Sequence, residues 1–226
     1  MTHIKENLQE VRNRIKIAAE KSARSESDVT LIAVTKTHPA EAINEAIKYG
    51  VTDIGENKVQ EIMDKYDKVD PVRWHLIGHL QTNKVKYIID KVAMIHSLDS
   101  IYLAQEIEKQ AAKRDRTVDV LCEINCGREE SKSGLMPEEA EDFCLSLGDF
   151  PHLRLRGFMT MAPKCEKNEE YRKYFQETSQ QCLDIWQKKL HNIGRPILSM
   201  GMSDSFEVAI EEGADIVRVG RALFAP

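Results

Sequence analysis

The sequence lacks the features that mark exported, membrane-spanning and nucleic-acid-binding proteins. Its 226 residues contain no apolar run of about 18 residues, and the charged stretch 1–23 has no apolar core of the signal-peptide type. Acidic residues outnumber basic ones by 37 to 32, so the net charge of −5 provides no positive field for a nucleic acid or an anionic membrane. We therefore expect a cytoplasmic protein that acts on small molecules.

Metal-binding and disulfide patterns are also missing. The five cysteines form no Cys-x-x-Cys pair and are odd in number, which argues against a zinc site and against a disulfide framework. No His-Glu-x-x-His motif, P-loop or dinucleotide-binding Gly-x-Gly-x-x-Gly is present. We interpret His75 and His79, four residues apart across a predicted strand end, as core or rim histidines. The sequence thus predicts reduced core thiols and no metal.

A regular alternation of strand-like and helix-like segments is what the sequence does contain. After an amphipathic helix over residues 4–18, eight strand-like segments alternate with seven helical ones. The strands are predicted at 31–35, 52–55, 74–78, 92–97, 118–125, 153–161, 197–200 and 215–219. Strict alternation requires parallel strands joined by right-handed crossovers. We predict one domain over residues 1–226, a (β/α)8 TIM barrel with an extra N-terminal amphipathic helix. An open doubly wound sheet is the alternative.

Lys36 stands at the end of the first predicted strand. Residues 31–35 are apolar or β-branched, and Pro39 begins a helical pattern three positions after the lysine. In parallel α/β folds, ligands and chemistry collect at this edge of the sheet. Lys36 is therefore a candidate site residue, and a solvated lysine at a strand end is the structural alternative.

Glycine-bearing turns follow the last two predicted strands, at residues 199–205 and 217–222. In barrel enzymes these two loops, with a helix N-terminus beneath them, commonly bind phosphate. Ser203 offers a hydroxyl where a helix is predicted to begin at Asp204, and Gly220 has no Cβ to keep a phosphate from the backbone N–H groups. Ordinary helix capping by Ser203 is the alternative.

Arg218 interrupts an otherwise apolar strand. Alternation along the strand places it on one face with Ile216 and Gly220. If that face lines the barrel interior, the buried guanidinium needs an acceptor, because an unpaired buried charge is very costly. The acceptor is either a carboxylate, such as Glu56 or Glu123, or an atom of a ligand.

A lysine beside a phosphate site suggests a phosphorylated carbonyl compound held as a Schiff base. Burial lowers the pKa of a lysine, and only the neutral amine attacks a carbonyl. Pyridoxal 5′-phosphate offers an aldehyde for Lys36, a phosphate for Ser203 and Gly220, and a ring nitrogen for Arg218. A sugar phosphate in an aldolase is a more distant alternative.

Several specific motifs are spread over nearly the whole chain. They are Ala33-Val34-Thr35-Lys36, Gly55-Glu56-Asn57, Trp74-His75, Ile77-Gly78, Leu80-Gln81-Thr82-Asn83-Lys84, Gly157-Phe158-Met159, and the stretches 199–204 and 217–220. On these residues the sequence resembles the pyridoxal phosphate homeostasis protein family. The resemblance implies a barrel similar to the N-terminal domain of alanine racemase.

The resemblance also implies a role for each candidate site residue. Lys36 would form the Schiff base, and Arg218 would face the pyridine nitrogen. Ser203 would bind the phosphate together with the backbone of Gly220 and Arg221, although many relatives have a small hydroxyl residue where Arg221 stands. The residues around the ring or the phosphate would be Asn57, Met200 and Met202.

The function implied is a carrier rather than an enzyme. The expected activity is binding and delivery of pyridoxal phosphate in intracellular homeostasis, with pyridoxal-phosphate-dependent apoenzymes as partners.

An arginine can only donate to the ring nitrogen, which weakens the ring as an electron sink. A two-base racemase needs a second acid or base, which alanine racemase takes from another domain across a dimer. Because the chain ends soon after the last strand, at Phe224-Ala225-Pro226, we expect no such domain and a monomer. An amino-acid racemase is the leading alternative.

Overall fold

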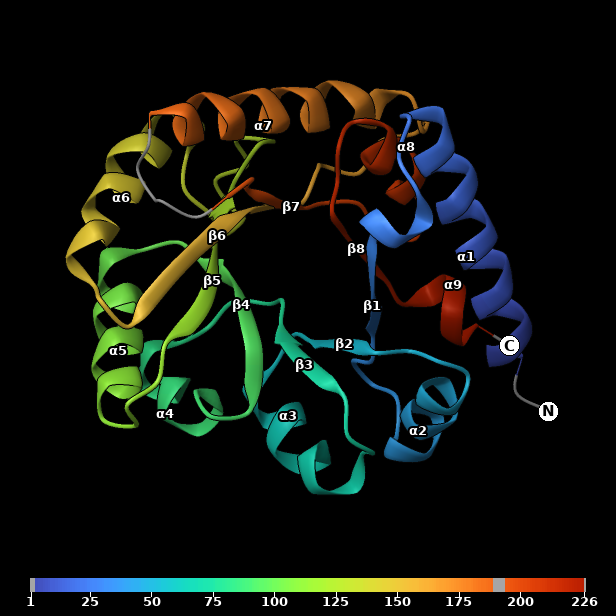
Figure 1. The fold of residues 1–226 in the computed structure, drawn as a ribbon, viewed down its shortest axis with the longest axis horizontal. Helices are drawn as coiled ribbons and strands as arrows, with labels where there is room; N and C mark the ends of the chain where they lie inside the picture. The colour runs from blue at the N-terminus through green and yellow to red at the C-terminus, as the bar shows by residue number, and fades with distance from the viewer. Residues whose placement is uncertain (1–2, 189–193, 226) are drawn as a thin grey trace.

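The computed structural model describes residues 3–188 and 194–225, and it has the predicted closed barrel (Figure 1). Met1 and Pro226, at the ends of the predicted domain, lie outside the described residues. The parallel strands pair in chain order, and β1 pairs with β8 to close the sheet. They are β1 (Thr30–Val34), β2 (Asp53–Glu56), β3 (Arg73–Leu76), β4 (Val92–Leu98), β5 (Val118–Ile124), β6 (Leu153–Thr160), β7 (Ile197–Ser199) and β8 (Ile216–Val219).

Helices surround the barrel, as Figure 1 shows. Those between successive strands are α2 (Ala40–Lys48), α3 (Val59–Lys65), α4 (Val85–Ile88), α5 (Ile101–Ala112), α6 (Ala140–Ser146), α7 (Glu170–Gln187) and α8 (Phe206–Glu211), while α1 (Ile4–Lys21) and α9 (Arg221–Phe224) flank them. Short 3-10 helices are η1 (Glu26–Asp28), η2 (Tyr66–Lys68), η3 (Thr82–Lys84), η4 (Pro137–Glu139) and η5 (Leu147–Asp149). The TIM-barrel prediction is therefore confirmed.

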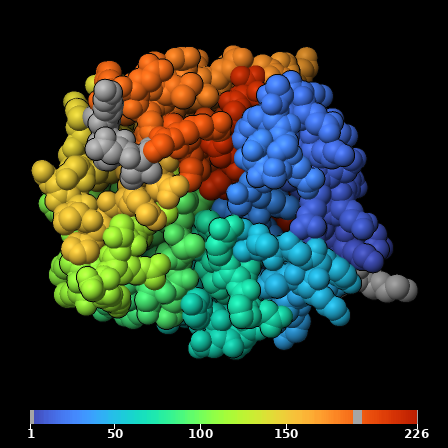
Figure 2. Space-filling model, in the orientation of Figure 1, coloured from blue at the N-terminus to red at the C-terminus, as the bar shows by residue number. Residues whose placement is uncertain are grey.

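The extra helix α1 closes the outer layer beside the C-terminal segment. Its periodic residues Leu8, Val11 and Ile15 are buried, as an amphipathic helix on a core requires. The amide of Asn7 donates to the carbonyl oxygens of Leu223, at 3.1 Å, and of Ala225, at 3.0 Å. Figure 2 shows the blue N-terminal segment against the red C-terminal one. The predicted N-terminal helix is thus part of the helical layer that surrounds the barrel.

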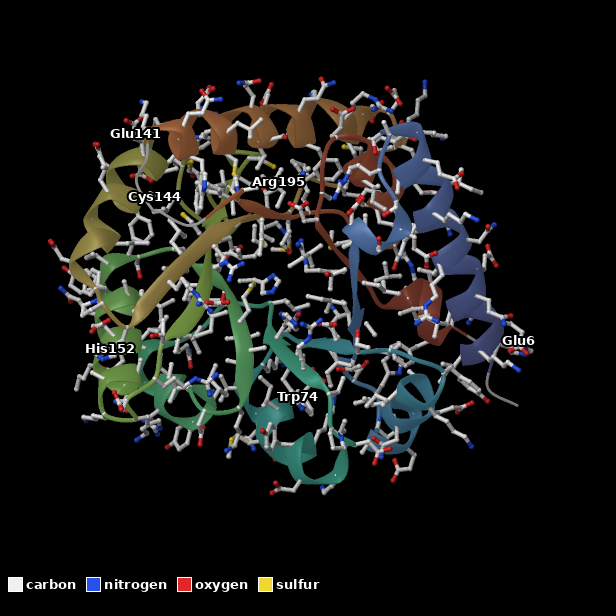
Figure 3. All side chains as sticks on the ribbon, in the orientation of Figure 1. Glu6, Trp74, Glu141, Cys144, His152 and Arg195 are labelled. Carbon is white, nitrogen blue, oxygen red and sulfur yellow. The ribbon has the colours of Figure 1, made fainter. Side chains whose placement is uncertain are left out.

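Two separate apolar cores follow from the period-two alternation of the strands. The outer core lies between the sheet and the helices, and it includes Trp74, which Figure 3 shows beside β3 on the side of α3. The interior of the barrel holds a smaller cluster made of Ile32, Met94, Leu121, Met159 and Ile216. Side chains alternate between the two faces of a strand, so Lys36 lies on the same interior face as Ile32, and Arg218 lies on the same interior face as Ile216. Both residues are at the carboxyl end of their strands.

Several predicted helix boundaries were wrong. Helix α8 begins at Phe206 rather than Asp204, because the Met202 N–H donates to Ser205 Oγ, at 3.2 Å, and a turn closes before the helix. The helix predicted over 82–90 is a 3-10 turn followed by the short α4. Pro39 is the N-cap of α2 rather than its first residue, and α9 was not predicted at all.

The chemistry that the cysteines and histidines offer is limited. All five cysteines are free thiols, and four are buried. Within residues 3–188 and 194–225, no group of His, Cys, Asp and Glu side chains is arranged to hold a metal ion. No helix in the same residues combines the length and apolar character needed to cross a bilayer.

Candidate functional site

The predicted site residues gather at the carboxyl ends of four neighbouring strands. Strands β7, β8, β1 and β2 are adjacent in the closed sheet, so the loops that follow them form one continuous part of the rim. Those loops carry the residues Lys36, Asn57, Met200, Met202, Ser203, Gly220 and Arg221. Residues from the two ends of the sequence therefore meet at one site.

The backbone on both sides of Lys36 is bound by helix α3. Lys65 Nζ donates to the Thr35 carbonyl oxygen, at 3.0 Å, and to Glu61 Oε2, at 2.9 Å. Glu61 Oε2 in turn accepts the Thr37 N–H at 2.8 Å. Thr37 has a φ of +67°, in the left-handed region, so this tight turn is held in a conformation that a threonine rarely adopts. Lys36 itself is exposed, so the predicted burial of its side chain was wrong.

Glu56 belongs to this support and not to the barrel interior. It is fully buried, and it accepts hydrogen bonds from Thr35 Oγ1, at 2.7 Å, and from Lys65 Nζ, at 2.8 Å. Burial raises the pKa of Glu56, and these two hydrogen bonds oppose the rise. Since its side chain faces α3, Glu56 is not the acceptor of Arg218, and that alternative was wrong.

Arg218 lies inside the barrel with only 3% of its surface exposed. Its Nη1 donates to Ser199 Oγ at 2.7 Å, and its Nη2 donates to the Thr160 carbonyl oxygen at 2.9 Å. No carboxylate of the described residues forms an ion pair with it. Two of the five N–H donors of a guanidinium are thus used, and the other three have no acceptor in the described chain.

Glu123, the other predicted partner of Arg218, is buried nearby without a hydrogen bond to it. Burial and the charge of Asp99 together raise the pKa of Glu123 to about 7, although the charge of Arg218 opposes the rise. Burial also lowers the pKa of Arg218 to about 10, against the opposing effect of Glu123. The guanidinium therefore keeps its positive charge at neutral pH. The carboxyl group of Glu123 is largely protonated at pH values below 7.

Backbone donors are available between the two last loops. The N–H groups of Ser203, Gly220 and Arg221 donate to no acceptor in the described residues. A Cβ added at Gly220 would lie 3.1 Å from the Val34 carbonyl oxygen, so this approach of two strands leaves little space for a side chain. Ser203 Oγ accepts the Ala222 N–H at 3.4 Å, so it does not cap α8, the alternative that the sequence had left open.

The remaining predicted residues differ in their access to this site. Arg221 is exposed and pairs with Asp204, and both line a pocket of about 430 Å³ together with Met202 and Glu123. Met200 is instead 1% exposed and its side chain packs in the outer core, so its place beside a ligand stays a prediction that only its backbone can fulfil. Alternation explains the difference, because Met200 follows Ser199 and points to the opposite face of β7.

The donors present fit the polar groups of pyridoxal phosphate in kind. The Lys36 amine is exposed for an aldehyde, and the unused N–H donors of Arg218 are available to a ring nitrogen. The Ser203 hydroxyl and the free backbone N–H groups beside it are suited to a phosphate.

Sequence reasoning missed the side chains that lie behind Arg218. Ser199 and His96 are fully buried on the interior faces of β7 and β4, and they hydrogen bond to each other at 3.0 Å. The sequence did contain a signal for them: each is a polar residue in an apolar strand, and the alternation of side chains places it on the face that points into the barrel. His75 is a core histidine and His79 lies on the rim, as predicted.

Comparison with known proteins gives one consistent result. Residues 4–226 match the family model described as alanine racemase, N-terminal domain. A pyridoxal phosphate homeostasis protein of Aquifex aeolicus is 44% identical over 221 residues, 97% of this chain and 96% of the relative. PipY of Synechococcus elongatus, solved with pyridoxal phosphate bound, superposes with a TM-score of 0.85 at 30% identity, covering 98% of this chain and all of PipY. An alanine racemase of Clostridium difficile shares the fold, with a TM-score of 0.73 at 18% identity, and the match covers 98% of this chain and 56% of the racemase.

Proposed function

The chain belongs to the pyridoxal phosphate homeostasis protein family, and we propose that it binds pyridoxal 5′-phosphate as a Schiff base on Lys36 and delivers it to apoenzymes. The PipY structure, which aligns along this chain, has pyridoxal phosphate bound. The bound cofactor supplies a reactive aldehyde, and this protein would hold that aldehyde reversibly.

The buried guanidinium of Arg218 is the observation that carries the proposal. This cation is 3% exposed and has no carboxylate partner among the described residues, so its three unused N–H donors are available to an acceptor from outside the chain. The cofactor's ring nitrogen is such an acceptor. Lys36 and the free N–H groups of Ser203 and Gly220 stand on the adjoining rim, where the aldehyde and the phosphate need partners.

The same residue supports a carrier over a catalyst. With a pKa of about 10, Arg218 stays protonated at neutral pH and acts only as a donor. A ring nitrogen that accepts from it carries no proton of its own and is a weak electron sink. We therefore propose that the protein has no robust catalysis, and that a monomer is sufficient because this chain supplies all the donors named above.

Cofactor transfer tests the proposal. The loaded protein, freed of unbound cofactor, is mixed with an apoenzyme that requires pyridoxal phosphate, and recovery of that enzyme's activity is compared with spontaneous dissociation from this protein. Recovery faster than dissociation is expected, with Lys36→Ala, loaded in the same way, as the control that transfers none. Cofactor retained for hours with acceptor in excess would rule out delivery. Inversion of an amino acid at about 1 s⁻¹ or faster would instead favour the racemase.

A further inference from the structure

Arg218 is connected to Asp53 by an unbroken series of buried hydrogen bonds through the barrel. Ser199 Oγ, the acceptor of Arg218 Nη1, lies 3.0 Å from His96 Nδ1. His96 Nε2 lies 3.0 Å from His75 Nδ1, and His75 Nε2 lies 2.9 Å from Asp53 Oδ1. All five residues are at most 5% exposed. They come from strands β8, β7, β4, β3 and β2, so the series crosses the barrel interior from one wall to another.

The Asp53 end of the series fixes the direction of its bonds when both histidines are neutral. Arg218 can only donate. Asp53 is a carboxylate that can only accept, because hydrogen bonds from His75, Arg73 and Thr52 overcome the effect of burial and lower its pKa to about 2. Burial lowers the pKa of His96 well below its usual value, and the charge of Arg218 acts in the same direction, so His96 is neutral.

With a neutral His75, only one arrangement of protons gives each link a single donor. Ser199, which accepts from Arg218, donates its hydroxyl proton to His96 Nδ1. His96 donates from Nε2 to His75 Nδ1, and His75 donates from Nε2 to Asp53. The reverse direction would place an unprotonated His75 Nε2 against a carboxylate oxygen 2.9 Å away, which leaves two acceptors facing each other. This direction places the proton of each histidine on Nε2.

We propose that Ser199, His96, His75 and Asp53 are positioning residues that fix the guanidinium of Arg218 for the pyridine nitrogen of the bound cofactor. The inference rests on the proposed function. Ser199 holds Nη1 and the Thr160 carbonyl holds Nη2, and two anchors determine the plane of a rigid guanidinium. Ser199 remains a good acceptor because His96 takes its proton, and His96 is oriented by His75 and Asp53 in turn.

The protonation pattern is tested on the wild-type protein without cofactor. Nitrogen-15 NMR distinguishes Nε2–H from Nδ1–H imidazoles and from imidazolium through the shifts of the two ring nitrogens. Near neutral pH, His75 and His96 should both be neutral Nε2–H tautomers. An Nδ1–H tautomer or a charged ring at either position would overturn the one-way series. This measurement does not depend on cofactor binding, so its failure is distinct from failure of the proposed function.

The positioning role is tested with His96→Gln, which breaks the series at its centre. The visible band of the bound cofactor should shift, and the rate of cofactor loss should rise roughly tenfold, as expected when one hydrogen bond to a charged group is lost. His152→Gln is the matched control, since His152 pairs with Glu108 and no member of the series. If wild-type protein binds the cofactor and His96→Gln leaves both band and rate unchanged, the positioning role is wrong. If His96→Gln does not fold, Ser199→Ala makes the same test nearer to Arg218.

Discussion

At the scale of single residues, Gly201 shows how closely the site loop is packed against α8. Its φ is +92°, and a Cβ added there would lie 2.6 Å from Ala209 Cβ and 2.9 Å from Phe206 Cα. Both the conformation and the lack of space exclude a side chain. Gly201→Ala should lower the free energy of unfolding by roughly 2 kcal/mol or more, as measured by chemical denaturation.

Gly148 offers the matched control for this substitution. A Cβ at Gly148 would have no heavy atom within 4 Å, and its φ is not in the left-handed region. Gly148→Ala should change the unfolding free energy by less than about 1 kcal/mol. Equal effects of the two substitutions would show that the Gly201 loop is not constrained as described.

Glu123 should make the stability of the protein depend on pH. Its pKa is about 7 in the folded protein against an ordinary value of 4.5, so the folded state binds one more proton between these values. Stability from this group is therefore present at low pH and is lost as pH rises from about 4.5 to 7, by up to about 3 kcal/mol.

Glu123→Gln should remove that loss, because the amide has no proton to release. In chemical denaturation, the variant should gain stability relative to wild type between about pH 5 and pH 8. Glu6→Gln, a change on the exposed face of α1, should follow wild type at both values. A difference between Glu123→Gln and wild type that is the same at both pH values would contradict the raised pKa.

At the scale of elements, helix α3 fixes the turn that presents Lys36. The Lys65 ammonium group is shared among the Thr35 carbonyl, Glu56 and Glu61, and the Glu56 carboxylate is fully buried. Lys65→Met should lower the free energy of unfolding by about 3 kcal/mol, because it leaves a buried carboxylate without its cation. Thermal and chemical denaturation both measure this loss.

A second substitution separates the charge from the loss of packing. Lys65→Met combined with Glu56→Gln should recover part of the stability, since the uncompensated charge is removed. Lys68→Met, on the exposed face of η2, should change stability by less than about 0.5 kcal/mol. If Lys65→Met behaves like Lys68→Met, the contacts between α3 and the Lys36 turn contribute little.

At the scale of the whole molecule, the sequence predicted the barrel because its signals are local and repeated. Strand and helix periods alternate eight times, and parallel pairing follows from that order. Lys36 and Arg218 were found because each is a charged residue at or inside an apolar strand. Short elements such as α9 and the turn before α8 gave no periodic signal, because α9 depends on contacts with the distant helix α1 and the turn on one hydrogen bond between Met202 and Ser205.

The positions that the sequence could not settle depend on which strands are neighbours. Lys36 is such a position, since it is exposed on the rim formed by β7, β8, β1 and β2, whereas the burial of Met200 follows from alternation along β7. The series from Arg218 to Asp53 joins five strands, and no pattern within one strand indicates it. Pairings of this kind are properties of the closed sheet.

The most direct measurement for the whole account is the covalent attachment of pyridoxal phosphate. The protein is mixed with the cofactor, the imine is reduced with borohydride, and the modified peptide is identified by mass spectrometry. We expect a single pyridoxyl adduct on the peptide that contains Lys36, and no equivalent adduct in Lys36→Ala. An adduct of equal yield in Lys36→Ala, or one on another lysine of the wild-type protein, would contradict the assignment of Lys36 and with it the proposed site.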